Sequence, residues 1–344
     1  MEYKKKFRVS TVHAAYLGAP EEANPESECF SGDSAKKYVY DNIGYTAEWI
    51  RKAGEGGADL VCTNEDFAAA GTYGRDVTHP CLFAEIVAET APVIERMASE
   101  AAKRYGMYIA ANYYRYEGRT MYNASTLFGR NGEVIGVYRK VHPADGERWL
   151  VSPGDGFPVF ETDLGRIGMS ICYDMIFPET FRCLALNGAD IILLQTQGWG
   201  TGGCSGAAVG EGIMRARAAE NCVYFIVAKN VQNDGGKSLI LDNSGNSIAE
   251  AQGGGDRLLT ADIEPDFDMT DIYHYDNYFG DVPGTRARMM LARRPAAYGA
   301  IVGGKPALMD RYDGLSLCET YARAEPILNR LRNMDDALKS KYHW

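Results

Sequence analysis

A carboxylate, an ammonium and a thiol stand where three apolar stretches of the sequence end. Glu65 closes the run ADLVCTNE, Lys140 closes EVIGVYRK, and Cys172 closes IGMSIC. Apolar runs of this length with β-branched residues are typical of buried strands. Side chains at the ends of such strands lie on the rim of a sheet, so the three groups can converge on one pocket. A thiol nucleophile, a carboxylate base and an ammonium that stabilises an oxyanion together suit attack on a carbonyl carbon.

The chemistry of such a site fits the transfer of an acyl group from nitrogen. A neutral thiol is a poor nucleophile, and a carboxylate in an apolar pocket is a stronger base than one in water, so Glu65 can take the thiol proton. Lys140 offsets the negative charges and donates to the oxyanion, and one such donor is typically worth about 3 kcal/mol. Glu65 then returns the proton to the leaving amine, and water cleaves the thioester left on Cys172.

Each of these residues also has a simpler interpretation. Glu65 can cap a following helix, Lys140 can be a strand-edge lysine that blocks pairing, and Cys172 can be a small, inert core residue. His142 is an alternative base. It lies two residues after Lys140, so on a strand the two side chains would face the same side. No separate Asn or Asp context marks His142 as oriented. The functional interpretation therefore depends on the combination of residues.

The residues around Cys172 predict the structural unit that holds the thiol. An apolar run at 167–171 predicts a strand, Pro178 begins a helical pattern, Asn187-Gly188 ends it, and a second apolar run follows at 191–194. The thiol therefore lies at a tight turn between a strand and a helix. Such a turn holds a thiol stiffly and can direct backbone N–H groups at a reacting oxygen.

The rest of the chain alternates between predicted strands and helices. Strands are predicted at 7–13, 58–62, 107–114, 123–128, 134–141, 223–229, 238–241, 248–251 and 258–263, helices at 35–53, 83–104, 213–221, 285–294 and 325–342, and loops at 18–34, 71–80 and 198–212. Two β-rich halves, each covered by helices on one side, predict an α/β fold with a four-layer αββα sandwich. We expect one domain over 1–280 and a C-terminal extension over 281–344.

The composition and charge of the chain disfavour several classes of function. The chain has 344 residues, is 46% hydrophobic and carries a formal charge of −10, which disfavours nucleic acid and anionic membranes as partners. Its eight cysteines form no CxxC pair and its five histidines are scattered, so neither a disulfide framework, a metal site nor another cofactor is expected. No run of about 18 apolar residues predicts a membrane span. No secretory signal is recognised, and a cytoplasmic protein is expected.

Five segments, in this order, resemble the nitrilase, or carbon–nitrogen hydrolase, superfamily. They are ADLVCTNE, NGEVIGVYRKVHP, the block from PGDGFPVFETDLGRIGMSICYD to LLQTQ, RARAAENCVYFIVAKN, and SLILDNSGNSIAEA. The resemblance implies the same αββα sandwich. Small departures affect the local loops, since the family often has Pro where this chain has Asn64 and Leu where it has Pro143.

The resemblance also implies roles, residue by residue. Glu65 matches the family's general base, Lys140 the lysine that stabilises the tetrahedral intermediate, and Cys172 the nucleophile. Glu147 matches a second glutamate that helps to position lysine, substrate or water. The backbone N–H of Tyr173 matches part of the oxyanion hole.

Other residues carry weaker predictions. Trp199, in the glycine-rich stretch 198–212, is expected to line the mouth of the pocket, or simply to pack. Cys204, in the same stretch, is more simply a bystander than an oxidisable site. Arg217 and Glu220 are spaced to form a structural pair on a helix.

The sequence Cys172-Tyr173-Asp174 resembles the amidase and N-carbamoyl hydrolase branches of the family. We therefore expect a small amide or ureido substrate; a nitrile is the alternative. No cluster of arginines marks a substrate carboxylate, although one arginine from any loop is enough. A catalytically silent scaffold on the same fold is the alternative of another class. The family also implies a homo-oligomer, a dimer or larger, that associates through the helices beside the nucleophile and the C-terminal extension.

Overall fold

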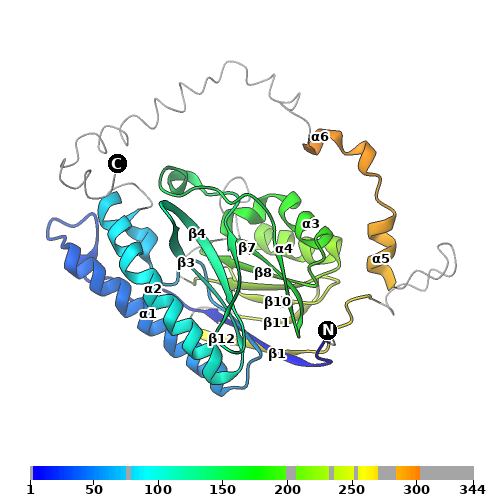
Figure 1. Ribbon diagram of the computed structural model, residues 1–344, viewed down its shortest axis with the longest axis horizontal. Coiled ribbons are helices and arrows are strands. Elements are labelled where there is room, and N and C mark those ends of the chain that lie inside the picture. The colour runs from blue at the N-terminus through cyan, green and yellow to red at the C-terminus, as the bar shows by residue number, and fades with distance from the viewer. Residues whose placement is uncertain are drawn as a thin grey trace, which may run out of the picture. The chain divides into compact units, whose positions relative to one another are not determined.

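The computed structural model of the protein describes residues 3–74, 79–198, 207–231, 236–251, 255–269 and 284–302 (Figure 1). The chain divides into two compact units, residues 1–274 and residues 275–344. The first unit holds both sheets. Within the described residues, no helix combines the length and the apolar character needed to cross a membrane.

The described strands of the first unit form two six-stranded sheets. In spatial order, the first sheet contains β12 (Arg257–Ile263), β1 (Phe7–His13), β2 (Leu60–Cys62), β3 (Tyr108–Glu117), β4 (Thr120–Phe128) and β5 (Val134–Arg139). The second contains β11 (Ser247–Glu250), β10 (Leu239–Leu241), β9 (Tyr224–Lys229), β8 (Ile191–Thr196), β7 (Gly165–Ile171) and β6 (Val159–Thr162). Strands β1, β2 and β3 pair in parallel, as do β7, β8 and β9, and the outer strands pair antiparallel.

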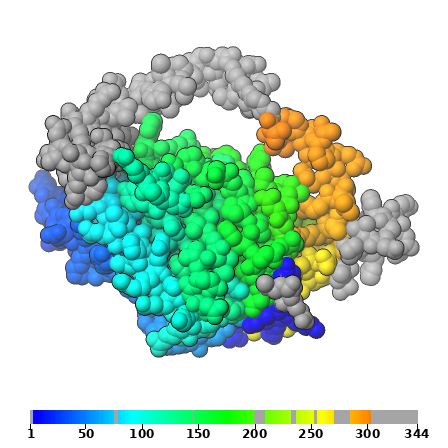
Figure 2. All heavy atoms as spheres, viewed as in Figure 1, coloured from blue at the N-terminus to red at the C-terminus, as the bar shows by residue number. Residues whose placement is uncertain are grey.

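Helices cover the outer face of each sheet. Helices α1 (Gly32–Glu55) and α2 (Pro80–Tyr105) pack on the first sheet, and α3 (Pro178–Leu186) and α4 (Ala207–Asn221) pack on the second (Figure 1). Figure 2 shows the atoms of α2 and of the β3–β4 region packed side by side on one face. The core between the sheets is apolar and includes Leu60, Leu127, Ile171 and Leu193. The central strands are buried on both faces, which explains their continuous apolar runs. The predicted αββα sandwich is confirmed.

Several element boundaries differ from the sequence predictions. The predicted loop at 18–34 contains a short 3-10 helix, Glu21–Ala23, and α1 already begins at Gly32, where the side chain of Ser31 caps it. The predicted loop at 71–80 overlaps a 3-10 helix, Ala70–Tyr73, and ends at the start of α2. These local hydrogen-bonded turns leave no hydrophobic period in the sequence, and a period is the signal that predicts helices.

Two further differences concern α4 and β6. Residues 207–212 form the beginning of α4, so the loop predicted at 198–212 is wrong over this part. The signal for a loop was the seven glycines among these fifteen positions, and two of them, Gly210 and Gly212, lie in the helix. Strand β6 was not predicted, and it pairs antiparallel with β7 at the edge of the second sheet. An edge strand of four residues, only partly buried, lacks the apolar run of a central strand.

In the second unit, α5 (Gly284–Leu291), a 3-10 helix (Pro295–Ala297) and α6 (Gly299–Val302) are described. The helix predicted at 285–294 therefore ends earlier, at Leu291. The helix predicted at 325–342 lies outside the described residues. The boundary between 280 and 281 stays a prediction.

Candidate active site

Two strand ends of the first sheet bring Lys140 and Glu65 together. Glu65 lies three residues after β2, and Lys140 directly follows β5, with its backbone N–H donating to Asn123 O (2.9 Å). The Lys140 Nζ donates to Glu65 Oε1 (2.9 Å) and to Glu147 Oε2 (2.8 Å). The lysine side chain is only 2% exposed, so a fully formed ion triad lies inside the protein. Neither a helix cap for Glu65 nor a strand-edge role for Lys140 describes this arrangement.

Strands β3 and β4 supply donors that the sequence analysis missed. Asn123 Nδ2 donates to Glu65 Oε1 (3.1 Å) and to Glu147 Oε1 (2.7 Å), so one amide ties the two carboxylates together. Tyr114, which is directly opposite Asn123 in the sheet, donates its OH to Glu147 Oε1 (3.1 Å). Asn112 Nδ2 in turn donates to Asn123 Oδ1 (2.9 Å). Two asparagines within otherwise apolar strand sequences were the available signal, because a buried amide requires partners.

The charges in this cluster stabilise one another. Burial by itself lowers the pKa of Lys140, but the charges of Glu147 and Glu65 outweigh it and hold that pKa well above its ordinary value. Burial by itself raises the pKa of Glu147, but the Lys140 charge and the hydrogen bonds to Glu147 lower it. Lys140 is therefore an ammonium and Glu147 a carboxylate at neutral pH.

Cys172 lies at the turn where β7 ends. It is the first residue of a short 3-10 helix, Cys172–Ile176, and its φ of 44° lies in the left-handed region, which is strained for a residue with a Cβ. Asp174, fully buried, stabilises this turn, because its Oδ2 accepts from Ile171 N (2.9 Å) and from Tyr138 OH (2.7 Å). The strained residue is thus fixed by hydrogen bonds on the residues next to it.

The thiol of Cys172 meets the Glu65–Lys140 pair across the two sheets. Cys172 keeps part of its surface exposed, as access to a substrate requires. Burial raises the pKa of the thiol to about 12, the charge of Glu65 and a hydrogen bond to it also raise this pKa, and Lys140 and a hydrogen bond to Thr196 lower it. The thiol is therefore neutral at neutral pH and needs a base beside it, and Glu65 is the carboxylate whose charge acts on its pKa.

His142 is oriented by an aspartate, contrary to the sequence analysis. Its Nδ1 lies 2.8 Å from Asp174 Oδ1, its backbone N–H donates to the same oxygen (3.1 Å), and its ring stacks on Phe177 with centroids 3.8 Å apart. The aspartate that was overlooked is the third residue of the Cys172-Tyr173-Asp174 motif itself. His142 therefore belongs to the hydrogen-bond network of Asp174, which supports the turn at Cys172.

The remaining candidate residues divide between the described and the undescribed part of the chain. Tyr173 lies in the first turn of the 3-10 helix Cys172–Ile176. The backbone N–H groups of a helix's first turn have no partner within the helix. Trp199 and Cys204 lie outside the described residues. The expected pair of Arg217 and Glu220 is present at 2.9 Å on α4. Among the described residues, no group of three or more His, Cys, Asp or Glu side chains is arranged to hold a metal ion.

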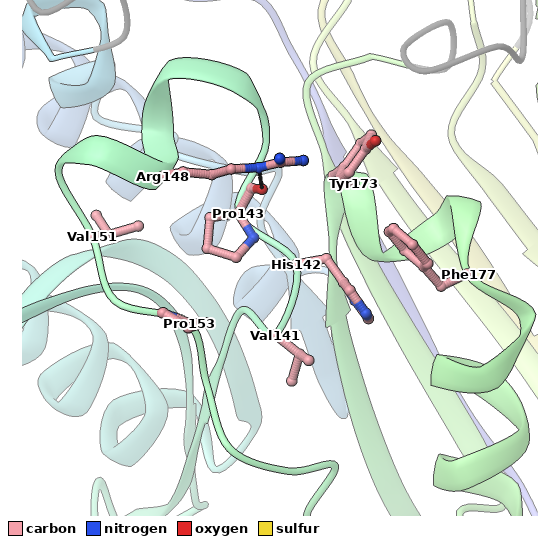
Figure 3. Close-up of a pocket in the computed structure, with 8 residues that line it drawn as sticks. All are labelled: Val141, His142, Pro143, Arg148, Val151, Pro153, Tyr173 and Phe177. Carbon is pink, nitrogen blue, oxygen red and sulfur yellow. Dashed lines mark hydrogen bonds between the residues drawn. The ribbon is translucent and has the colours of Figure 1, made fainter. Parts of the chain in front are cut away.

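A pocket of about 330 Å³ opens next to these residues (Figure 3). It is lined by Val141, His142, Pro143, Arg148, Val151, Pro153, Tyr173 and Phe177. Three of these directly follow a candidate residue in the chain: Val141 follows Lys140, Arg148 follows Glu147, and Tyr173 follows Cys172. None of the four candidate side chains is itself part of the lining. The pocket is therefore adjacent to the charged cluster without containing it.

The family model described as carbon-nitrogen hydrolase matches residues 38–267. The chain belongs to the carbon–nitrogen hydrolase family. The match includes all four candidate residues, and it confirms the predicted class, a hydrolase of C–N bonds other than peptide bonds.

Several curated proteins and solved structures are similar to this chain. A citrullinase from Francisella tularensis is 29% identical, with 58% of this chain and 72% of the relative covered. A nitrilase from Pyrococcus abyssi is 30% identical, with 65% of this chain and 83% of the relative covered. The chain spans between 53% and 83% of the length of the curated relatives it matches. The crystal structure of a carbon-nitrogen hydrolase from Helicobacter pylori G27 shares the fold, with a TM-score of 0.63, 22% identity, and coverage of 76% of this chain and 89% of that one.

Replacing Tyr138 with phenylalanine tests whether the hydrogen bonds to Asp174 support the turn at Cys172. The change removes the hydroxyl that donates to Asp174 and accepts from Val141 N (3.3 Å). Because Asp174 is buried, we expect the free energy of unfolding to fall by about 1–3 kcal/mol. Urea denaturation measures this loss. Tyr122→Phe is the matched control, since the structure gives the Tyr122 hydroxyl no hydrogen bond within the described residues. Equal stability of the two variants would show that the Asp174 network does not support the turn.

Proposed function

We propose that the protein hydrolyses the amide or N-carbamoyl (ureido) group of a small molecule through a thioester on Cys172, with release of ammonia or an amine. One observation carries the proposal: the buried Lys140 ammonium contacts the Glu65 carboxylate, and the charges of both groups act on the neutral Cys172 thiol and shift its pKa. A base, a cation and a nucleophile that share one site are the minimum for acyl transfer by a thiol.

In the first half-reaction, Glu65 accepts the thiol proton as the Cys172 sulfur bonds to the carbonyl carbon. The carbonyl oxygen takes the negative charge, which the Lys140 ammonium and the backbone N–H of Tyr173 stabilise. The C–N bond then breaks as Glu65 transfers the proton to the departing nitrogen. Ammonia or an amine leaves, and the acyl group stays on the sulfur as a thioester.

In the second half-reaction, Glu65 takes a proton from water as the water oxygen attacks the thioester carbon. The second oxyanion is stabilised by the same donors. The carbon–sulfur bond breaks, the sulfur recovers its proton from Glu65, and the carboxylic acid or carbamic acid leaves. The site returns to its starting protonation state, so Glu65 acts as acid and base in each half-reaction.

Glu147 is suited to positioning rather than to proton transfer. Its carboxylate accepts from Lys140 Nζ, Asn123 Nδ2, Tyr114 OH and the backbone N–H of Ala144 (3.0 Å). Donors on both oxygens stabilise the charged form, which lowers the pKa of Glu147 and weakens it as a base. We infer that Glu147 holds Lys140 in place and keeps its charge throughout the cycle.

Two observations favour this proposal over a silent scaffold and over a nitrilase. A scaffold gains little from a buried ion triad, because replacing such groups with apolar residues is often neutral or stabilising. The nitrile alternative retains support from the similarity to a nitrilase. The motif Cys172-Tyr173-Asp174 and the similarity to a citrullinase, whose name indicates a ureido substrate, favour amide and ureido compounds.

The decisive experiment is an ammonia-release assay of the purified full chain against matched amides, ureido acids and nitriles of equal carbon number. We expect turnover of at least one amide or ureido compound, with nitriles at least tenfold slower. Turnover of nitriles alone would replace the proposal with the nitrilase alternative. A protein that binds members of the panel and turns over none of them is a scaffold.

The predictions on association and location remain proposals. We propose a small-molecule substrate and a homo-oligomer of two or more copies, with residues 281–344 packing on a partner subunit. We also propose a cytoplasmic location.

A further inference from the structure

The pocket next to the cluster combines an apolar wall with one cation at its edge. Val141, Val151 and Pro153 lie on one side, and Tyr173 and Phe177 lie on the other (Figure 3). Of the lining residues, Arg148 has a permanent charge, while the only other titratable side chains are those of His142 and Tyr173. Most of the wall can pack against methylene groups, and burying each one is worth about 0.8 kcal/mol.

Arg148 is held in place but is not neutralised. Its Nε donates to Pro143 O (3.0 Å), and its guanidinium carbon lies 5.9 Å from the centre of the Tyr173 ring. Figure 3 shows the side chain extended from its helix toward Tyr173. Within the part of the chain that the structure describes, no carboxylate pairs with Arg148, whereas Arg139 and Arg166 both have acidic partners. The terminal nitrogens of Arg148 are therefore available to an anion.

Arg148 and Tyr173, the residue that follows Cys172, line the same pocket. Arg148 and Tyr173 each directly follow a residue of the catalytic cluster, and consecutive Cα atoms are about 3.8 Å apart. A substrate whose carbonyl carbon contacts the sulfur therefore needs only a short chain to enter the pocket. A planar guanidinium with two free nitrogens matches a carboxylate, which it binds with two parallel hydrogen bonds.

We propose that this pocket selects the substrate, and that Arg148 binds a carboxylate that a few methylene groups separate from the amide or ureido group. The inference rests on the proposed function and adds the substrate class, a small amide or ureido acid. The methylene groups pack on Val141, Val151 and Phe177. Arg148 is a specificity residue and takes no part in proton transfer.

The test compares two substrates of the same length that differ in one end group. Glutaramic acid carries a carboxylate where valeramide carries a methyl group. For the wild-type protein we expect kcat/KM to be at least tenfold higher for the acid. In Arg148→Gln this preference is expected to fall roughly 10- to 100-fold, the cost of a lost charge-assisted hydrogen bond, and the change is expected in KM rather than in kcat. Arg148→Lys is expected to retain part of the preference, because a point charge lacks the two-pronged geometry.

Arg119→Gln is the matched control, since Arg119 is exposed and outside the pocket, and it should retain the wild-type preference. Equal kcat/KM values of the wild type for the two substrates would overturn the inference, as would an equal loss for both substrates in Arg148→Gln.

A binding measurement separates this inference from the proposed function. Titration calorimetry of the inactive Cys172→Ala protein with glutaramic acid needs no turnover. We expect Kd to rise at least tenfold when Arg148→Gln is added, and to rise with salt only when Arg148 is present. If the wild type releases ammonia from no amide or ureido compound of the panel, the proposed function fails, whereas binding that is unaffected by Arg148→Gln overturns the subsite alone.

Discussion

Replacing Cys172 with alanine is expected to abolish hydrolysis and leave the fold intact. In the proposed mechanism the Cys172 thiol forms the thioester, so we expect the rate of ammonia release to fall roughly 10⁴-fold or more. Alanine has a Cβ as cysteine does, so the left-handed φ of 44° adds no new strain. The Asp174 hydrogen bonds that hold the turn come from other residues and stay in place. The thermal midpoint, followed by circular dichroism, should therefore change little.

Cys29→Ala is the control for this variant, because Cys29 is exposed and lies far from Cys172 in the sequence. It should retain the wild-type rate. A mass measurement on acid-quenched wild-type protein should show the acyl group on the peptide that contains Cys172, and no adduct in Cys172→Ala. Ammonia release by Cys172→Ala above one-hundredth of the wild-type rate would exclude the thiol as the nucleophile.

Replacing Lys140 with methionine is expected to remove activity and also to destabilise the fold. The change leaves Glu65 and Glu147 as two buried carboxylates without their shared cation. Breaking a buried ion pair in this way typically costs about 3–5 kcal/mol. Loss of one oxyanion donor lowers kcat by roughly 10²–10³. Urea denaturation and the ammonia assay measure the two effects on the same samples.

The loss of unfolding free energy in Lys140→Met is expected to depend on pH. In the wild type, Lys140 lowers the pKa of Glu147, so Glu147 contributes stability that is present above its unfolded pKa and is lost as the pH falls. Without the cation, burial and mutual repulsion raise the pKa of at least one carboxylate above its unfolded value of about 4.3. That group stabilises the fold at low pH and loses this contribution as the pH rises through the raised pKa.

The difference in unfolding free energy between wild type and Lys140→Met should therefore be larger at pH 8 than at pH 5. Adding Glu147→Gln removes one of the two unpaired carboxylates. The double variant should recover part of the stability and none of the activity. A stability difference that is the same at both pH values would show that the carboxylates are not left charged and buried, and thus that Lys140 does not hold them.

The sequence by itself determined which residues end the central strands and what chemistry they offer. Apolar runs need burial on both faces, so their position in the chain sets where the buried strands β2 and β7 end, close to Glu65 and Cys172. Lys140 follows β5, an edge strand that is only partly buried. The same runs, separated by helical patterns, were enough to predict the sandwich. Local signals failed where structure is set by short hydrogen-bonded turns, as at Glu21–Ala23, or by edge pairing, as for β6. They also failed where glycines lie within a helix, as at the beginning of α4.

The tertiary structure decided which polar groups meet. Lys140 pairs with a carboxylate 75 residues away, and Asn123 joins two carboxylates that lie 58 and 24 residues from it. Asp174 orients His142 across 32 residues. Such partners depend on strand register and on how two sheets face each other, which no local pattern of residues encodes. A buried charge is tolerated only where the packed fold supplies its partners, so the protonation of the site is a property of the folded chain.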